Sequence, residues 1–441
     1  MNDFLLGDLA LARGHLIVSS PNLTPDPDKE RAFATEVVAA LRAAGFEAYW
    51  AGGCVRDQLL GQTPHDYDVA TDARPEQIQQ VFNRRKTLAI GAAFGVITVL
   101  GPRGAGQIEV ATFRQDLSYS DGRRPDSVRY SSAREDAVRR DFTINGMFFD
   151  PVAQRTIDYV GGQDDLQRRQ IRAIGSPQAR FEEDKLRMLR AVRFAAVLNF
   201  ALDPATAEAI IHMAAQIQVV SAERIAAEMR AMLVRTGRQR ALQLLIEVGL
   251  LAVVLPEVAD ALAGACDRLI RTKALLAKLD SPPFPLALAV LLSAVADAQR
   301  ALTQQVGARW KLSNQEIERT AWLVEHRDAL WNSHSTPWSQ LQPLLINESA
   351  RELLAWHEAI AVVDGRDAAP LIECRARMAW PREKLDPPLL LTGADLIAIG
   401  IQRGPIYSQI LKSVRDRQLD GQLETTPQAL EFVRTRFNGR S

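Results

Sequence analysis

The sequence predicts an α+β protein in which a mixed α/β head over residues 31–165 is followed by an all-α remainder. In the head, short runs rich in β-branched and aromatic residues alternate with segments of helical periodicity. After Ile174-Gly175 the strand signals end, and almost every later segment has helical periodicity. We detect no repeat at a fixed period. Because their patterns differ, the head and the remainder are expected to be different domains.

Turns rich in proline and glycine suggest how the chain divides further. Residues 1–30 are a proline-punctuated extension without a periodic pattern. The helical remainder is expected to contain three segments, over residues 166–235, 236–325 and 326–441. Its helices are interrupted at Pro256, Ser281-Pro282-Pro283 and Pro387-Pro388.

The composition is that of a soluble protein with several domains. The chain has 441 residues, 47% of them hydrophobic and 24% charged, which is long enough to bury two or more cores. Its 53 basic and 53 acidic residues cancel, so bulk charge does not predict a nucleic-acid partner. Two segments are slightly basic: residues 121–193 hold 14 Arg and one Lys against 12 acids, and residues 402–441 hold seven bases against four acids.

Cysteine usage and hydropathy predict a cytoplasmic protein. Cys54, Cys266 and Cys374 are odd in number and far apart, which favours a reducing compartment. The N-terminus lacks the pattern of a secretory signal, and no apolar run is long enough to span a membrane. The six histidines are scattered, which makes a zinc site an unfavoured interpretation.

Each expected element of the head follows from its local pattern. A helix over residues 32–44 has helical apolar spacing and stops at Gly45. Residues 46–51 form an apolar run typical of a strand. The further expected elements are helices over residues 55–60 and 75–83, and strands over residues 65–71, 94–100 and 107–113, the last two joined by a glycine-rich hairpin.

The glycine pair Gly52-Gly53 separates the first expected strand from the short helix over residues 55–60. Backbone amides at glycines can approach a phosphate closely, and a helix N-terminus favours anions. We therefore expect Gly52 and Gly53 to contact a triphosphate. Taken alone, a glycine pair before a helix is more often a tight turn.

Asp66 and Asp68 follow shortly after the glycine pair. If residues 65–71 form a strand, alternation places both carboxylates on one face, about two strand rises apart. That spacing suits a pair of Mg²⁺ ions bound by carboxylate oxygens. An Asp-x-Asp motif alone is usually a solvated strand edge, but its order and short distance from the glycines favour phosphoryl or nucleotidyl transfer.

Glu109 is expected to supply a third catalytic carboxylate beside Asp66 and Asp68. Its neighbours Ile108 and Val110 are expected to face the core, which leaves Glu109 on the open face of the strand. An ordinary strand acid is the alternative. The polar stretch over residues 114–137, with its tip at residues 121–126, is long enough for a mobile functional loop, although a plain surface loop stays open.

Residues 139–147 collect charged and amide side chains before a strand-like Met-Phe-Phe run. Arg140 can neutralise phosphate, while Asp141 and Asn145 can hold a ribose hydroxyl, so all three are candidate nucleotide-binding residues. A salt-bridged turn is the alternative. The following Gly161-Gly162 marks the junction with the helical remainder, either as a hinge or as a helix start.

A helix over residues 182–194 is expected to carry a polar stripe. Leu186, Leu189 and Val192 run along another side towards packing. An Asp only accepts and an Arg only donates hydrogen bonds, so a pair of them matches the Watson–Crick edges of adenine and cytosine and mismatches guanine and uracil. A salt-bridged surface helix is the alternative interpretation. The stripe consists of Asp184, Arg187, Arg190 and Arg193.

Five ordered segments give the chain a resemblance to class II tRNA nucleotidyltransferases and their bacterial poly(A) polymerase relatives. They are Gly-Gly-Cys-Val-Arg-Asp with Asp66-Tyr67-Asp68, residues 109–114, residues 139–147, residues 161–166 and residues 183–194. The resemblance covers residues 46 to about 250 closely. One departure is Gly146, which stands where alanine is usual in the family.

The resemblance implies a polymerase-beta-type nucleotidyltransferase head, a neck that selects the base (residues 166–235), a body and a tRNA-binding tail (residues 326–441). It implies Mg²⁺ bound by Asp66 and Asp68, which would activate the 3′-hydroxyl and hold the triphosphate. The implied partners are tRNA, CTP and ATP, with no membrane partner, and the protein is expected to be a monomer or a dimer. The nucleotide contacts implied by the resemblance are Gly53, Arg56 and Arg140, with base selection by Asp184 and Arg187 and with Arg190 and Arg193 nearby.

The resulting prediction is an enzyme that adds CMP and AMP to the 3′ end of tRNA and releases pyrophosphate. The resemblance also implies that enzymes adding only CC tend to lack the loop tip that this chain has at residues 121–126, which disfavours that variant. Addition of the terminal A alone, poly(A) synthesis and a non-catalytic RNA-binding protein remain as alternatives. A dinucleotide-dependent oxidoreductase is disfavoured because no third spaced glycine follows Gly52-Gly53.

Overall fold

The structure is a computed structural model, and it divides into two compact units. The first unit comprises residues up to Ala263 together with Arg309–Leu312, and the second comprises Gly264–Ala308 and residues from Ser313 onwards. We treat each unit by itself. The residues described by the structure are 26–64, 66–91, 95–116, 128–296 and 299–437.

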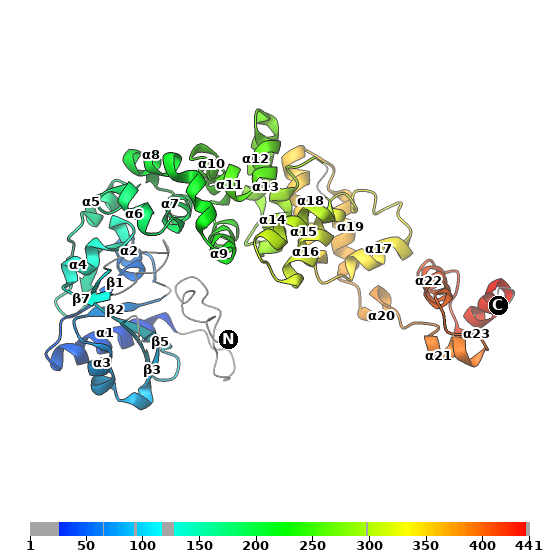
Figure 1. The fold of residues 1–441 in the computed structure, drawn as a ribbon. Helices are drawn as coiled ribbons and strands as arrows, with labels where there is room; N and C mark the ends of the chain where they lie inside the picture. Colours follow the sequence, from blue (N-terminus) through cyan, green and yellow to red (C-terminus); the bar gives the residue numbers. More distant parts are fainter. Residues whose placement is uncertain (1–25, 65, 92–94, 117–127, 297–298, 438–441) are drawn as a thin grey trace. The chain divides into compact units, whose positions relative to one another are not determined.

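A seven-stranded mixed sheet forms the centre of the head (Figure 1). All neighbouring strands in it are antiparallel except β2 and β5, which run parallel. The predicted combination of a mixed sheet with helices is thereby confirmed. In spatial order the strands are β3 (Thr87–Gly91), β4 (Val96–Leu100), β5 (Gln107–Thr112), β2 (Asp68–Thr71), β1 (Ala48–Ala51), β8 (Phe148–Asp150) and β9 (Arg155–Ile157).

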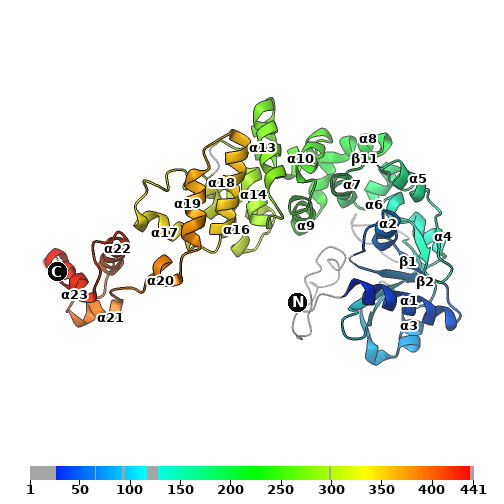
Figure 2. The same cartoon turned by 180° about the vertical axis from the view of Figure 1, so that it is seen from behind.

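Helices pack on both faces of this sheet. The helix α1 (Pro27–Ala43) lies across β1, β2 and β5 and buries Phe33, Val37 and Leu41 (Figures 1 and 2). On the other face, alanines of α4 (Ala133–Val138) pack in one cluster with Phe113 and Phe148. Most side chains of β1 and β2 are therefore buried, while Asp68 at the start of β2 and Glu109 on β5 are partly exposed.

Two expectations for the head need correction. The strand predicted over residues 65–71 begins only at Asp68, because its antiparallel partner β1 ends at Ala51, directly opposite Asp68. The stretch over residues 114–137 is not a plain loop at its ends, which form β6 (Arg114–Asp116), β7 (Val128–Tyr130) and α4. The loop tip at residues 121–126 lies outside the described residues.

The rest of the first unit is helical, with one exception. A two-residue strand β11 (Ala201–Leu202) pairs in parallel with β10 (Gln170–Ile171), so the region after residue 175 is not purely helical as expected. Gly161 ends the head with a left-handed backbone and α5 follows directly, which makes the glycine pair a helix start. The remaining helices of the first unit are α2 (Gly53–Leu59) and α3 (Pro75–Phe82) in the head, followed by α5 (Gly162–Gln167), α6 (Pro177–Glu183), α7 (Leu186–Val197), α8 (Pro204–Met213), α9 (Ala222–Leu233), α10 (Arg238–Glu247), α11 (Leu251–Val254) and α12 (Pro256–Leu262).

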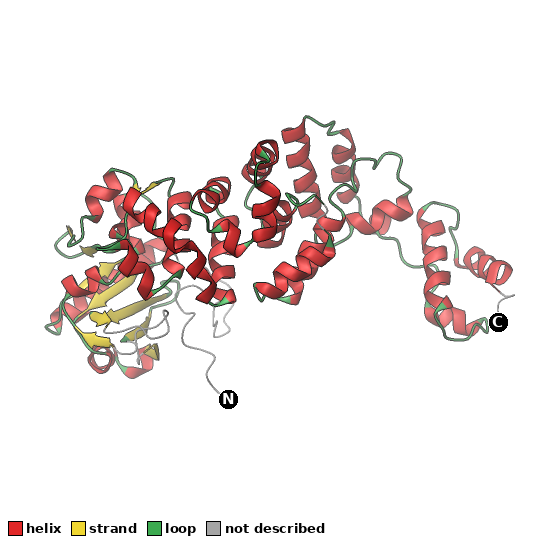
Figure 3. Cartoon of the chain, turned by 45° about the horizontal axis from the view of Figure 1, so that its top comes forward, coloured by secondary structure: helices red, strands yellow, loops and turns green. Residues whose placement is uncertain are grey.

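The described part of the second unit contains helices and loops only (Figure 3). Its helix α14 (Phe284–Leu292) is apolar throughout and fully buried. No helix in the described residues is both long and apolar enough to span a membrane. The other helices are α13 (Cys266–Lys278), α15 (Arg300–Arg309), α16 (Asn314–Glu325), α17 (Trp338–Leu345), α18 (Ala350–Asp364), α19 (Ala369–Met378), α20 (Arg382–Leu385), α21 (Gly393–Ala398), α22 (Ile406–Leu419) and α23 (Thr426–Phe437).

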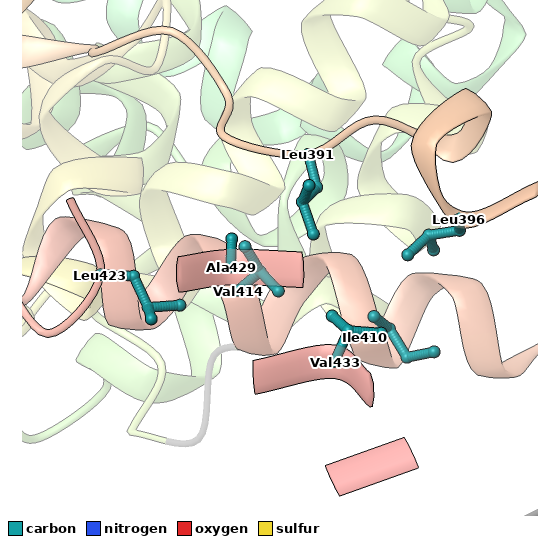
Figure 4. Close-up of a cluster of buried hydrophobic side chains, with 7 residues drawn as sticks. All are labelled: Leu391, Leu396, Ile410, Val414, Leu423, Ala429 and Val433. Carbon is teal, nitrogen blue, oxygen red and sulfur yellow. The ribbon is translucent and has the colours of Figure 1, made fainter. Parts of the chain in front are cut away.

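The last three helices share a small core of their own. Ile410 and Val414 of α22 pack against Leu396 of α21 and Val433 of α23 (Figure 4). The helix α22 also packs against α17, and Ser339 of α17 donates hydrogen bonds to Asp420, which follows the end of α22. Residues 391–437 are therefore a folded part of the second unit.

Candidate active site

The pairing of three strands brings two carboxylates to the edge of the glycine turn. Asp68 on β2 lies directly opposite Glu109 on β5 and, on its other side, opposite Ala51 on β1. Directly opposed residues on paired strands project to the same face, with strands about 4.8 Å apart. Glu109 is partly exposed between the buried Ile108 and Val110, as alternation predicts. Asp68 and Glu109 are thus neighbours on one face of the sheet.

Asp66 takes a different position from the one expected. It precedes β2, so strand alternation does not fix its direction, and its side chain is exposed. Between the two aspartates, Tyr67 is buried and packs edge-on against Trp50, with ring centroids 4.8 Å apart. This anchored tyrosine fixes the backbone that carries Asp66 to the start of β2.

The glycine pair forms the turn between β1 and α2. Gly52 has a φ of 77°, and its amide donates to the carbonyl of Met147 at 3.3 Å. A side chain here would meet Arg140, because a Cβ built on Gly52 would lie 3.0 Å from Nη1 of that arginine. Position 52 therefore requires glycine both for its backbone and for its close approach to Arg140. Burial raises the pKa of the adjacent Cys54 thiol to about 12, so this thiol is not a nucleophile.

Asp136 holds two arginines at the same end of the sheet. One of its oxygens accepts from Arg139 at 2.7 Å and the other accepts from Arg140 at 3.0 Å. Burial alone would raise the pKa of Asp136, but the charges of Arg140 and Arg139 outweigh it and the pKa is lowered. Asp136 is therefore ionised and holds Arg140 against the glycine turn.

A chain of hydrogen bonds links the head to α7. Arg56 donates to Oδ1 of Asn145 at 2.8 Å, Asn145 donates to Asp141 at 3.2 Å, and Arg190 donates to Asp141 at 2.7–2.9 Å. Burial would raise the pKa of Asp141, yet the charge of Arg190 and the hydrogen bonds from Arg190 and Asn145 lower it to about 2. In this structure the predicted ribose contacts Asp141 and Asn145 are engaged within the protein, as in the salt-bridged-turn alternative.

The polar stripe predicted on one helix is divided between a helix and the junction before it. Asp184 has an extended backbone between α6 and α7, and its carboxylate accepts from the amide of Leu186 at 3.0 Å. The Leu186 amide thus bonds to a side chain instead of to a backbone carbonyl of the preceding turn, and the helix is interrupted between Glu183 and Leu186. The predicted continuous helix over residues 182–194 is therefore wrong in its first turn. Arg187 remains next to Asp184, since its amide donates to the Asp184 carbonyl at 3.1 Å.

Each stripe residue has a partner in this structure. Arg187 pairs with Glu183 and also donates to the carbonyl of Arg180. Asp184 accepts from Arg224 at 2.7 Å. Leu186, Leu189 and Val192 are buried as expected.

Two residues of α9 that pair with the stripe, Arg224 and Glu228, were missed by the sequence analysis. Glu228 is completely buried, accepts from Arg193 at 2.5 Å and lies 3.7 Å from Arg190. The only signal in the sequence is an Arg and a Glu four residues apart on an amphipathic helix, which usually marks a surface pair. We call the arginines 56, 140, 190, 193 and 224 the arginine network; its acids are Asp136, Asp141, Asp184 and Glu228.

The structure brings most predicted site residues together within the first unit. Gly52, Asp68 and Glu109 meet at the sheet, and Arg56 and Arg140 lie at the same turn. Within the described part of the chain, no three His, Cys, Asp or Glu side chains converge as a preformed metal site. The donor set still fits magnesium, since Asp68 and Glu109 offer adjacent carboxylate oxygens.

Comparison with known proteins adds evidence that does not depend on the geometry of the site. A family model described as the poly A polymerase head domain matches residues 48–172. A second, described as the probable RNA- and SrmB-binding site of polymerase A, matches residues 199–262. The first match covers the sheet together with every head residue of the candidate site.

Relatives match over most of the chain. The CCA-adding enzyme of Enterococcus faecalis is 34% identical over 399 residues, which cover 90% of this chain and 94% of the relative. That of Lacticaseibacillus paracasei is 36% identical over 392 residues, 88% of this chain and 92% of the relative.

Solved structures agree with these relatives. The CCA-adding enzyme of Bacillus stearothermophilus in complex with CTP has a TM-score of 0.75 and 29% identity, covering 96% of this chain and all of that chain. The Thermotoga maritima enzyme complexed with tRNA shares the fold, with a TM-score of 0.60, 20% identity and coverage of 93% and 96%. The chain belongs to the family of the CCA-adding enzymes.

Proposed function

We propose that this protein is a tRNA nucleotidyltransferase that uses CTP and ATP to build or repair the CCA terminus of tRNA. The observation that carries the proposal is the placement of Asp68 opposite Glu109, next to the turn at Gly52, in a chain that belongs to the CCA-adding enzymes. In the reaction, the 3′-oxygen of the tRNA forms a bond to the α-phosphorus of the nucleotide. The bond to the β-phosphate breaks, and pyrophosphate leaves.

We propose Mg²⁺ as the cofactor, held by Asp66 and Asp68, with Glu109 as the third catalytic carboxylate. When bound, the metal supplies charge neutralisation at the triphosphate and a lower pKa for the attacking hydroxyl. The carboxylates contribute the negative charge that would hold the metal beside the sheet. Asp68 is placed by its strand partners, and Asp66 by the buried Tyr67 beside it.

The nucleotide contacts that we propose lie around this edge of the sheet. Backbone amides at the turn and two arginines would bind the triphosphate, because arginine offers paired donors to phosphate oxygens. An incoming base would replace the partners that Asp184 and Arg187 have in this structure, namely Arg224 and Glu183. The proposed contacts are Gly52, Gly53, Arg56 and Arg140 for the triphosphate, Asp141 and Asn145 for the ribose, and Asp184 and Arg187 for the base, with Arg190 and Arg193 nearby.

We propose that the tail contributes a surface for tRNA. Trp338 and Trp380, which we call the tail tryptophan pair, are half-buried with ring centroids 5.3 Å apart. Arg377 lies over both rings, and Nζ of the exposed Lys384 lies 3.9 Å from the Trp380 ring centroid. Aromatic faces beside cations suit a nucleic acid, which offers both stacked bases and phosphates. Of the other tryptophans in the predicted tail, Trp356 belongs to the core.

The cellular location and the oligomeric state of the protein stay predictions from the sequence. We propose a cytoplasmic enzyme, on the basis of three unpaired cysteines that are far apart along the chain. We propose a monomer or a dimer.

The decisive test uses three tRNA substrates that lack the whole CCA, lack only the final A, or are complete. Each is incubated with one nucleoside triphosphate at a time and then with CTP and ATP together, and the 3′ ends are sequenced. We expect CCA on the first substrate, a single A on the second and no addition to the third. Addition of A to the second substrate alone would indicate a terminal-A enzyme, and runs of A on all three would indicate poly(A) synthesis.

A further inference from the structure

Phe194, near the end of α7, lies where three arginine side chains meet. The guanidinium carbon of Arg193 is 4.2 Å from the ring centroid, and those of Arg56 and Arg190 are each 5.3 Å from it. All three distances are within the roughly 6 Å over which a cation is attracted to an aromatic face. The proposed function assigns roles to these arginines but none to the ring.

The ring is fixed in place by its surroundings. Phe194 is 8% exposed, and Phe142 packs against it edge-on with centroids 5.8 Å apart and planes at 75°. Arg190 lies one helical turn before Phe194 on α7, whereas Arg56 comes from α2 in the head. The ring is therefore a contact point between the base-selecting helix and the glycine turn.

Each arginine at the ring also contacts an acid: Arg56 contacts Asp57 at 2.7 Å, and the other two share the following partners. Glu228 is shared between Arg190 and Arg193, with Asp141 as the second partner of Arg190. Guanidinium groups that share partners repel one another, more strongly at a site shielded from water. The negative face of an aromatic ring offsets part of this repulsion without adding a formal negative charge. Because Asp57, Asp141 and Glu228 already match the three arginines in number, a carboxylate in place of the ring would leave a net negative charge where the triphosphate is proposed to bind.

We propose that Phe194 is a positioning residue for the nucleotide: its ring holds Arg56, Arg190 and Arg193 together as a cationic surface for the polyphosphate of CTP or ATP. The inference rests on the proposed function, because it names what holds the nucleotide-binding arginines in place. Phe194 acts through these arginines, and it is distinct from the groups that select the base.

The first test removes the π face while keeping an apolar side chain, with Phe194→Leu. Phe194→Tyr keeps the ring, and the matched control is Phe200→Leu, at a buried phenylalanine six residues further along and outside the arginine network. For each variant we would measure KM and kcat with CTP and with ATP on tRNA, and the affinity for inorganic triphosphate with Mg²⁺ by calorimetry.

Phe194→Leu should raise KM for CTP and ATP by the same factor, about 3- to 30-fold, and weaken triphosphate binding to match. The kcat at saturating nucleotide and the choice among nucleotides should stay within about twofold of wild type. Phe194→Tyr should keep KM at the wild-type value. Equal triphosphate affinities in Phe194→Leu and wild type, or an equal loss in Phe200→Leu, would overturn the proposal.

Fluorinated phenylalanines at position 194 keep the test decisive if Phe194→Leu folds poorly. One, two and three fluorines withdraw electrons from the ring stepwise with little change in shape, so triphosphate affinity should fall stepwise if cations rest on the ring. An affinity independent of fluorination would show that the ring only packs. Triphosphate binding needs neither tRNA nor transfer, so a wild-type protein that binds triphosphate but transfers no nucleotide would contradict the proposed function alone.

Discussion

The arginine network of the first unit and the tail tryptophan pair of the second unit both gather cations around aromatic rings, but they differ in burial. In the network the acids Asp136, Asp141 and Glu228 are at most 11% exposed, and each contacts at least one arginine. At the tail pair Lys384 is exposed, and Arg377 pairs with Glu373 on its own helix, which is 36% exposed. Burial of its acids fixes the network in one arrangement, while the exposed Lys384 of the tail is accessible to a polyanion.

This difference assigns the two regions different tasks. Buried charges that share partners are costly to rearrange, so they suit a site where a nucleotide must be held in one geometry. Exposed cations gain little from their local partners and are available for phosphates along an RNA surface. The network should therefore govern nucleotide binding and choice, and the tail pair should govern affinity for tRNA.

The largest effect is expected at the carboxylates beside the network. Asp68→Ala should reduce transfer of both CMP and AMP to background, because the catalytic metal would lose a ligand. Stability and tRNA affinity should be nearly unchanged, since Asp68 is at the end of its strand. The measurement is single-turnover transfer, with Glu76→Ala on the exposed surface of α3 as control. Near-normal transfer by Asp68→Ala would refute the proposed role.

Removing a buried acid from the network should cost most in stability. Glu228→Gln leaves Arg190 and Arg193 without their shared carboxylate, which should lower the free energy of unfolding by about 3–5 kcal/mol. The matched control in the second unit is Glu358→Gln, whose partner Arg375 is exposed, and it should leave stability nearly unchanged. Thermal unfolding of both variants is the measurement. Equal losses would remove the distinction between buried and exposed pairs.

Acid should weaken the network through Asp141. Its pKa in the folded protein is about 2, below the ordinary value of 3.8, so the unfolded chain takes up the proton first as pH falls. The resulting stabilisation is complete above about pH 5, amounts to about 2 kcal/mol, and is lost as pH falls through 4 towards 2. Asp141→Asn should flatten this part of the stability curve. An unchanged pH dependence in that variant would contradict the assignment.

The smallest effect is expected at the tail pair. Trp380→Leu should weaken tRNA binding about five- to tenfold, the lower part of the range expected for loss of one aromatic contact with RNA. KM for CTP and ATP should be unchanged. Binding of tRNA without nucleotide is the measurement, with Trp356→Leu as a control that tests whether a core tryptophan in the same unit has the same effect. A change in nucleotide KM but not in tRNA affinity would reverse the assignment.

Local patterns predicted those parts of the fold that depend on local physics. Alternation within one strand placed Glu109 between Ile108 and Val110 correctly, and the alternation of strand-like and helical segments predicted the mixed α/β head. The start of β2 was misplaced because it depends on where the partner strand β1 ends, at Ala51. A single strand carries no record of its partner's length.

The site residues that the sequence analysis missed are distant in sequence from those they contact. Arg224 and Asp184 are 40 residues apart, and Glu228 and Arg193 are 35 apart. A similar long-range effect concerns Gly146: a Cβ there would lie 2.8 Å from a methyl of Val160, so Val160 and Ile174 fill the space that an alanine side chain would need. The helix pattern around Asp184 was misread because a side-chain oxygen replaced a backbone partner.

The central claim is that Asp184 and Arg187, beside the buried network, read the base, and the most direct test is competitive incorporation of all four nucleotides onto one tRNA by Asp184→Ala and Arg187→Ala. Loss of either partner leaves the other incompletely paired when the right base binds, which should relax discrimination against UTP and GTP by about tenfold to a hundredfold. Triphosphate affinity should change less than this selectivity. A uniform loss of rate across the four nucleotides, with the selectivity of Arg187→Ala intact, would contradict the account.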